Sequence, residues 1–151
     1  MKKNLIFTGL LFMAISVAFI SCKEDDGISI VPHFSSITCE PSSPAPNDSI
    51  TLTAVQDQIG NLINRTSYNW SFSYSYFTGN GSEAKDTTVT KSTTVVYDVN
   101  KSNPVMGFRV PEKIASDLSV SLDANYNLSG QTEGGQIYGR ATRSTKVYIN
   151  R

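Results

Sequence analysis

Hydrophobic and polar residues alternate along several stretches of this chain, most clearly in residues 68–77. There five aromatic residues share one parity, and three serines and an asparagine lie on the other. Because successive side chains of a strand point to opposite faces, the stretch predicts a strand with one aromatic face and one serine-rich face. The aromatic parity consists of Tyr68, Trp70, Phe72, Tyr74 and Tyr76.

Other runs rich in Thr, Val, Ile and aromatic residues are separated by clusters of Pro, Gly, Asn, Asp and Ser, which favour turns. These runs predict strands at 34–39, 49–55, 86–90, 93–99, 104–110 and 118–126, and a last strand or strand pair at 136–150. Arg143 interrupts the apolar parity of the last stretch, so we expect a bulge or a break at 142–144. No segment after the first 21 residues shows the apolar stripe of a helix.

Short strands without helices predict an all-β protein, a single antiparallel β-sandwich of about seven or eight strands. We expect Tyr68, Trp70 and Phe72 in its core, whereas Tyr74 and Tyr76 lie near enough to the strand end to reach solvent.

Three motifs of this sandwich, at 46–54, 68–72 and 118–122, resemble bacterial immunoglobulin-like domains, particularly the PKD type. The resemblance covers about residues 35–150 and implies an immunoglobulin-like fold. The Gly-Asp-Gly turn that continues the tryptophan strand of the PKD pattern is absent here, and the subfamily stays open.

The first residues follow a different pattern, in which Lys2 and Lys3 precede an apolar stretch at 5–20. This stretch is shorter than the roughly 20 residues that a membrane-spanning helix needs, so it predicts a signal peptide at 1–21.

The end of the signal peptide, Phe19-Ile20-Ser21-Cys22, resembles the lipobox of bacterial lipoproteins, with phenylalanine where leucine is usual. The resemblance implies that Cys22 receives a thioether diacylglycerol, that cleavage follows Ser21, and that the new amino terminus is acylated, for example with palmitate. An uncleaved precursor would instead be tethered by its own helix.

Lys23, Glu24, Asp25 and Asp26 follow the cysteine and resemble the signal that exports Gram-negative lipoproteins to the outer face of the outer membrane. The resemblance implies display at the cell exterior. The alternative is a lipoprotein that faces the periplasm, with charges that only keep the tether solvated. We expect residues 22–33 to form the lipidated terminus and an extended tether, and residues 34–151 to form the domain.

Removal of 21 residues leaves 130, a usual size for one domain. The formal charge then changes from zero to −2, which leaves no basic field for nucleic acid. With Cys22 lipidated, Cys39 is a lone thiol that we expect to be packed as a small apolar residue.

Catalytic and metal-binding patterns are nearly absent from the sequence. His33 is the only histidine, and Ser82 and Lys85 match Ser-x-x-Lys without the other motifs of penicillin-recognising enzymes. We therefore predict no enzyme activity, no cofactor and no metal. Asp-Ser and Asp-Thr pairs at Ser49 and Thr87 resemble acceptors for bacterial O-glycosylation, although both residues also suit strand starts.

Two classes of function remain open. The first is a non-catalytic surface protein that binds a glycan or a host protein, or serves an outer-membrane uptake complex. Tyr74, Tyr76 and Phe77 are its candidate ligand contacts, because sugar rings stack on exposed aromatic faces. The second is a structural or assembly subunit that pairs strand edges, with 145–150 as the pairing strand.

Overall fold

The computed structural model describes residues 27–77, 84–97 and 103–151, and for residues 84–97 the backbone alone. These residues form strands and no helix, as the alternating patterns predict. The strands are β1 (His33–Glu40), β2 (Ser49–Gln58), β3 (Ile63–Phe77), β4 (Ala84–Tyr97), β5 (Val105–Arg109), β6 (Leu118–Leu128) and β7 (Tyr138–Val147). No described segment forms a helix long and apolar enough to cross a membrane.

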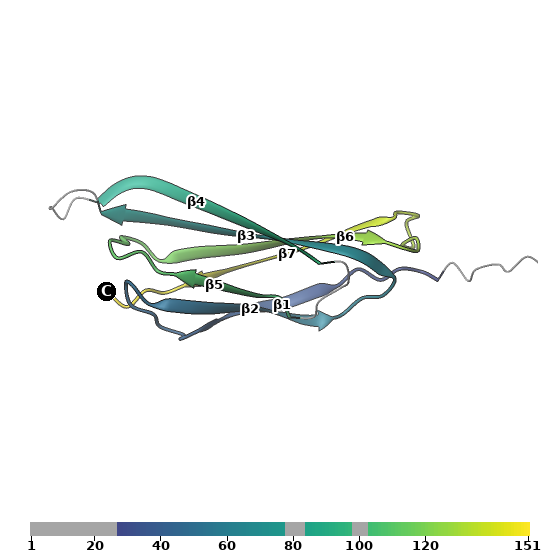
Figure 1. The fold of residues 1–151 in the computed structure, drawn as a ribbon, viewed down its shortest axis with the longest axis horizontal. Helices are drawn as coiled ribbons and strands as arrows, with labels where there is room; N and C mark the ends of the chain where they lie inside the picture. Colours follow the sequence, from purple (N-terminus) through teal and green to yellow (C-terminus); the bar gives the residue numbers. More distant parts are fainter. Residues whose placement is uncertain (1–26, 78–83, 98–102) are drawn as a thin grey trace, which may run out of the picture.

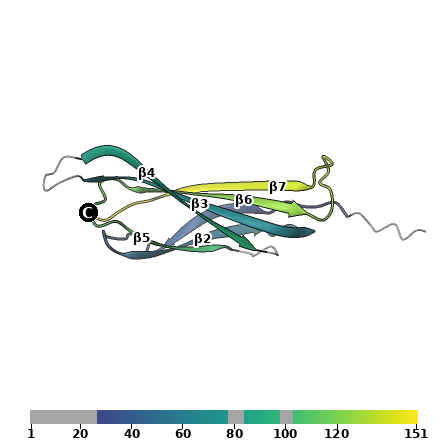
Figure 2. The same ribbon diagram turned by 45° about the horizontal axis from the view of Figure 1, so that its top comes forward.

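The strands form two sheets that pack face to face (Figures 1 and 2). Sheet A has the order β1-β2-β5, and sheet B has the order β4-β3-β6-β7. Every pairing is antiparallel, and β1 also contacts β7 across the edge between the sheets. The prediction of an all-β fold with two antiparallel sheets is therefore confirmed.

The core lies between the sheets and is built by the inward parity of each strand. Tyr68, Trp70 and Phe72 are at most 2% exposed, which confirms their predicted burial. Phe72 stacks on Phe108 of β5 with 4.3 Å between ring centroids, so the aromatic ladder of sheet B reaches across to sheet A. Leu118, Val120, Leu122, Ala124 and Tyr126 supply the matching inward face of β6.

Two features of strand boundaries differ from the sequence-based expectation. The run expected at 86–90 and the described part, 93–97, of the run expected at 93–99 belong to one continuous strand, β4, because the long β3 offers it partners from Thr66 to Phe77. Residues 98 and 99 lie outside the described residues. The expected bulge at Arg143 is absent, and β7 pairs with β6 without a register shift. Arg143 lies opposite the buried Leu122 yet remains exposed, because β7 is the outermost strand of sheet B.

The segment before β1 also differs from the expected tether, since residues 27–32 lie against the domain. The Ile30 amide donates to Asn61 Oδ1 at 2.7 Å, and the Asn61 amide donates to the Ile30 carbonyl at 3.0 Å. The Ser29 amide donates to the Gln131 carbonyl at 2.8 Å. The described residues 27–32 of the expected tether are therefore part of the folded body.

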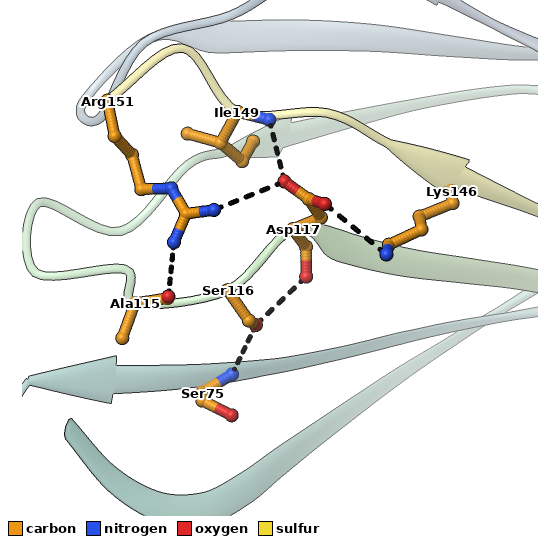
Figure 3. A network of polar contacts seen from close by, with 7 residues as sticks. All are labelled: Ser75, Ala115, Ser116, Asp117, Lys146, Ile149 and Arg151. Atoms are coloured by element: carbon orange, nitrogen blue, oxygen red, sulfur yellow. Dashed lines mark hydrogen bonds and ion pairs between the residues drawn. The ribbon is translucent and has the colours of Figure 1, made fainter.

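The opposite end of the sandwich is joined to the chain end by a network around Asp117 (Figure 3). Asp117 accepts from the Ile149 amide at 3.3 Å and pairs with Lys146 at 3.3 Å and with Arg151 at 3.5 Å. Arg151 also donates to the Ala115 carbonyl. Residues 148–151, which follow β7, are thus held close to the start of β6.

Candidate functional site

Several predicted site residues lie outside the described part of the chain. These are the lipid-attachment residue Cys22, the export-signal residues Lys23, Glu24, Asp25 and Asp26, and the side chain of Thr87 on β4. Ser49 is described, and it is exposed as the first residue of β2. The exposed position leaves the Ser49 hydroxyl accessible to modification. Its O-glycosylation stays a prediction.

The three aromatic candidates do not form an exposed platform. Tyr74 is 7% exposed and lies edge-on to Phe108, because it continues the inward parity of Trp70 and Phe72. This burial corrects the expectation that Tyr74 reaches solvent. The register of β3 shifts between Tyr74 and Tyr76, and both Tyr76 and Phe77 are half-buried.

The outer face of sheet B instead presents a regular array of small polar side chains. Ser119 and Ser121 are exposed, whereas Val120 and Leu122 beside them are buried. Three rows in register cross the sheet from β3 through β6 to β7: Ser71–Ser121–Ser144, Ser73–Ser119–Lys146 and Asn69–Asp123–Thr142.

This face is hollowed along its length into a groove that opens to solvent. Two adjoining hollows of about 490 Å³ and 550 Å³ share Ser71, Ser121 and Ser144. We call them together the serine groove. Serine side chains leave room here because they are shorter than the neighbouring arginine and lysine side chains. Among the described residues the lining contains no aromatic side chain.

One end of the serine groove carries a charged pair beside amide and hydroxyl groups. Arg140 donates from Nε and Nη2 to the two carboxylate oxygens of Asp123 at 2.8 Å and 2.7 Å. The hydrogen bonds that Arg140 donates to Asp123, and then the charge of that carboxylate, raise the pKa of the Arg140 guanidinium. Asn69 and Thr142 flank this carboxylate in the same row. The end thus offers both donors and acceptors within a small area.

The residues that could support catalysis are dispersed. His33 lies at the start of β1, where Nδ1 is 2.6 Å from Asp57 Oδ1 on the exposed surface. Cys39 is half-buried against the core, as expected, and burial followed by the Glu40 charge raises the pKa of its thiol. No group of three metal-ligating side chains occurs within the described ranges.

Sequence reasoning identified the serine parity of β3 but assigned it no function. The sequence did contain a signal for this face, because both strands carry small polar residues at alternate positions. These are Asn69, Ser71 and Ser73 in β3 and Ser119, Ser121 and Asp123 in β6. Only the register shows that these positions meet on one face and that Arg140 completes it from β7.

Comparisons with known proteins leave the family open. No protein-family model matches the chain, and no curated protein matches it. Among solved structures, the sporulation control protein Spo0M from Bacillus subtilis is similar, with a TM-score of 0.36 and 9% sequence identity. The match covers 83% of this chain and 50% of that protein, so the chain spans about half its length. A similarity this weak supports no functional conclusion.

Proposed function

We propose that this protein is a non-catalytic lipoprotein of the outer membrane, anchored through Cys22 and displayed at the cell exterior, which binds a polar glycan in the serine groove. The observation that carries the binding role is the cluster of Asp123, Arg140, Asn69 and Thr142 in an open hollow of about 490 Å³.

The chemistry of this cluster favours a ligand that is rich in hydroxyl groups. A carboxylate accepts hydrogen bonds, a guanidinium donates them, and hydroxyl and amide groups do both. Vicinal hydroxyls of a sugar can engage such a set simultaneously. Because the described lining lacks aromatic rings, recognition would depend on hydrogen bonds and not on the stacking that Tyr74, Tyr76 and Phe77 had suggested.

The arrangement of the anchor and the groove is compatible with this role. The chain enters the domain at one end of its long axis (Figure 1), whereas the serine groove lies on the outer face of sheet B. A lipid attached at Cys22 would hold the domain by that end and leave the groove open at the side.

For the domain type, we propose an immunoglobulin-like sandwich of the PKD kind. The sheets β1-β2-β5 and β4-β3-β6-β7 differ from the four-plus-three strands of a constant immunoglobulin domain in that β4 pairs with β3. The buried Trp70 on β3, the first strand of the chain in sheet B, supports this assignment.

The glycan proposal can be tested by retention of the protein on a panel of polysaccharides, neutral and acidic, in affinity electrophoresis. Asp123→Ala should weaken binding about 10- to 100-fold, because hydrogen bonds to a charged group contribute about 1.5–3 kcal/mol. Asp57→Ala is the matched control, since it removes another exposed carboxylate from an ion pair outside the groove.

Equal losses in the two variants would contradict a binding role for the groove. Absence of retention on every polysaccharide, together with crosslinking of an outer-membrane protein on intact cells, would favour the uptake-complex role.

The anchor can be tested by growing cells with a radiolabelled fatty acid. The protein should carry label, Cys22→Ser should not, and protease added to intact cells should remove the domain. A protein without label would contradict the anchor. A labelled protein that protease digests only after the cells are lysed would contradict the surface display.

The alternative assembly role through 145–150 has less support. The Ile149 amide already donates to Asp117 and the Asn150 amide donates to the Pro44 carbonyl at 2.8 Å. Two donors that an added strand would need are therefore occupied.

A further inference from the structure

Exposed apolar side chains gather at one end of the sandwich. Among the described residues, eight large hydrophobic side chains are exposed, and six of them lie where the chain enters the domain. We call these six the apolar end: Ile28, Ile30, Ile59, Leu62, Ile137 and Tyr138, each between 40% and 63% exposed. The other two, Val105 and Tyr148, lie on β5 and after β7.

Backbone hydrogen bonds bring the segments of the apolar end together. Ile30 is joined to the β2–β3 turn through Asn61, as described above. The Ser129 amide donates to the Leu62 carbonyl at 2.8 Å, and the Leu128 amide donates to the Ile137 carbonyl at 2.9 Å. Figure 1 shows these segments at the end from which the amino-terminal chain leaves.

The apolar end is a firm surface, because its entering segment is tightly packed. A Cβ atom at Gly60 would lie 2.5 Å from the Ile30 carbonyl oxygen, and one at Gly130 would lie 2.5 Å from the Gly27 carbonyl oxygen. Ser29, between the exposed Ile28 and Ile30, is buried. The isoleucines are therefore held outward on a fixed backbone.

The chain outside the described residues indicates what covers this surface. Only residues 23–26 separate the anchor site, Cys22, from Gly27. The five steps of extended chain from Cys22 to Gly27 span at most about 18 Å. The headgroup region of one leaflet is itself about 5–7 Å thick. A lipid on Cys22 would therefore hold the apolar end close to the bilayer.

We propose that the apolar end docks on the surface of the bilayer that holds the Cys22 lipid, which rests on the proposed anchor. Isoleucine and leucine side chains enter the boundary between headgroups and acyl chains, and Tyr138 suits the same interface through its apolar ring and polar hydroxyl. Asp57 and Glu133 are exposed at this end, so the contact is shallow. The long axis of the domain then stands away from the membrane.

The test uses the full lipidated protein in vesicles of phosphatidylethanolamine and phosphatidylglycerol. Cys39→Ser removes the described free thiol, and an environment-sensitive fluorophore is attached through Ile137→Cys or, as the matched control, Tyr148→Cys. Lipids that carry a quencher just below the headgroups should reduce emission from position 137 several-fold more than emission from position 148. Flotation with the vesicles reports the anchor separately.

Each outcome has a distinct meaning. Equal quenching at the two positions in protein that floats would overturn docking while the anchor stands, and failure to float would overturn both. If the label at position 137 is shielded in native outer membranes but not in vesicles, a membrane protein and not the bilayer covers the apolar end, and the proposal is overturned. If the label is shielded without lipid, to an extent that rises with protein concentration, a second copy of the protein covers the apolar end, and the proposal is likewise overturned.

Discussion

Trp70 is the largest fully buried side chain and lies in the middle of the aromatic ladder of β3. Its neighbours Tyr68 and Phe72 contact rings from other strands, so the ladder contributes to both sheets. At the scale of single residues, the stability of this domain therefore depends strongly on the inward-facing aromatic side chains of β3.

Trp70→Ala should lower the free energy of unfolding by about 3–5 kcal/mol, because the truncation leaves a cavity between the sheets. Chemical denaturation monitored by circular dichroism measures the change. Tyr138→Ala is the control, since it removes an exposed aromatic side chain and should change stability by about 0.5 kcal/mol or less. Equal effects of the two substitutions would place the ladder outside the core.

At the scale of elements, the segment 27–32 packs closely on the β2–β3 turn. Gly60 makes this possible, since its φ of 77° suits glycine and its missing side chain admits the Ile30 carbonyl. Gly135 has a similar φ of 75°, and nothing lies within 4 Å of its Cβ position.

This pair of glycines separates backbone strain from packing. Gly135→Ala should cost about 1–2 kcal/mol from the left-handed conformation alone. Gly60→Ala should cost more and should also speed hydrogen exchange at the Asn61 amide, which donates to Ile30. Equal costs, with unchanged exchange at Asn61, would show that the entering segment is not held by this contact.

The Asp117 network joins β6, β7 and the chain end, and its charge should make stability depend on pH. The Ile149 amide and then the Lys146 ammonium hold the pKa of Asp117 below its ordinary value. A carboxyl with a lowered pKa in the folded state stabilises the fold above its unfolded pKa of about 3.9, and this contribution is lost as the pH falls through the folded pKa.

Asp117→Asn should therefore lower the melting temperature at pH 7 and weaken the fall in stability below about pH 4. Thermal denaturation between about pH 2 and 7 measures both effects. Glu112→Gln, at an exposed position of the preceding loop, is the control and should change neither. An unchanged acid profile in the Asp117 variant would contradict the stabilising role of this carboxylate.

At the scale of the whole molecule, the proposed anchor and the apolar end act on the same end of the domain. A short tether keeps the local concentration of lipid surface high, which compensates for a contact that is weak by itself. The serine groove runs along the side and remains accessible in this orientation.

Insertion of about ten Gly/Ser residues between Asp26 and Gly27 should preserve fatty-acid labelling but reduce the quenching of a label at position 137, because a longer flexible tether lowers the effective concentration. The same insertion after Arg151 is the control and should change neither. Unchanged quenching with the long tether would show that docking does not depend on a short tether between Cys22 and Gly27.

Local periodicity was sufficient to predict the all-β class and the burial of Tyr68, Trp70 and Phe72, because alternation is a property of neighbouring residues. The resemblance of residues 19–22 to a lipobox implied Cys22 as an anchor, which stays a prediction. Local periodicity did not predict the burial of Tyr74. Burial near a strand end depends on contacts with other strands, and Tyr74 is covered by Phe108 from the other sheet.

Long-range pairing decided the features that no single stretch encodes. Arg143 needs no bulge because β7 is an edge strand, and Ile30 belongs to the domain because Asn61 binds its backbone. The serine groove exists because three strands align their polar faces in register. The sequence determined which side chains face the same way along each strand, and the tertiary structure alone decided which strands, and therefore which chemical groups, became neighbours.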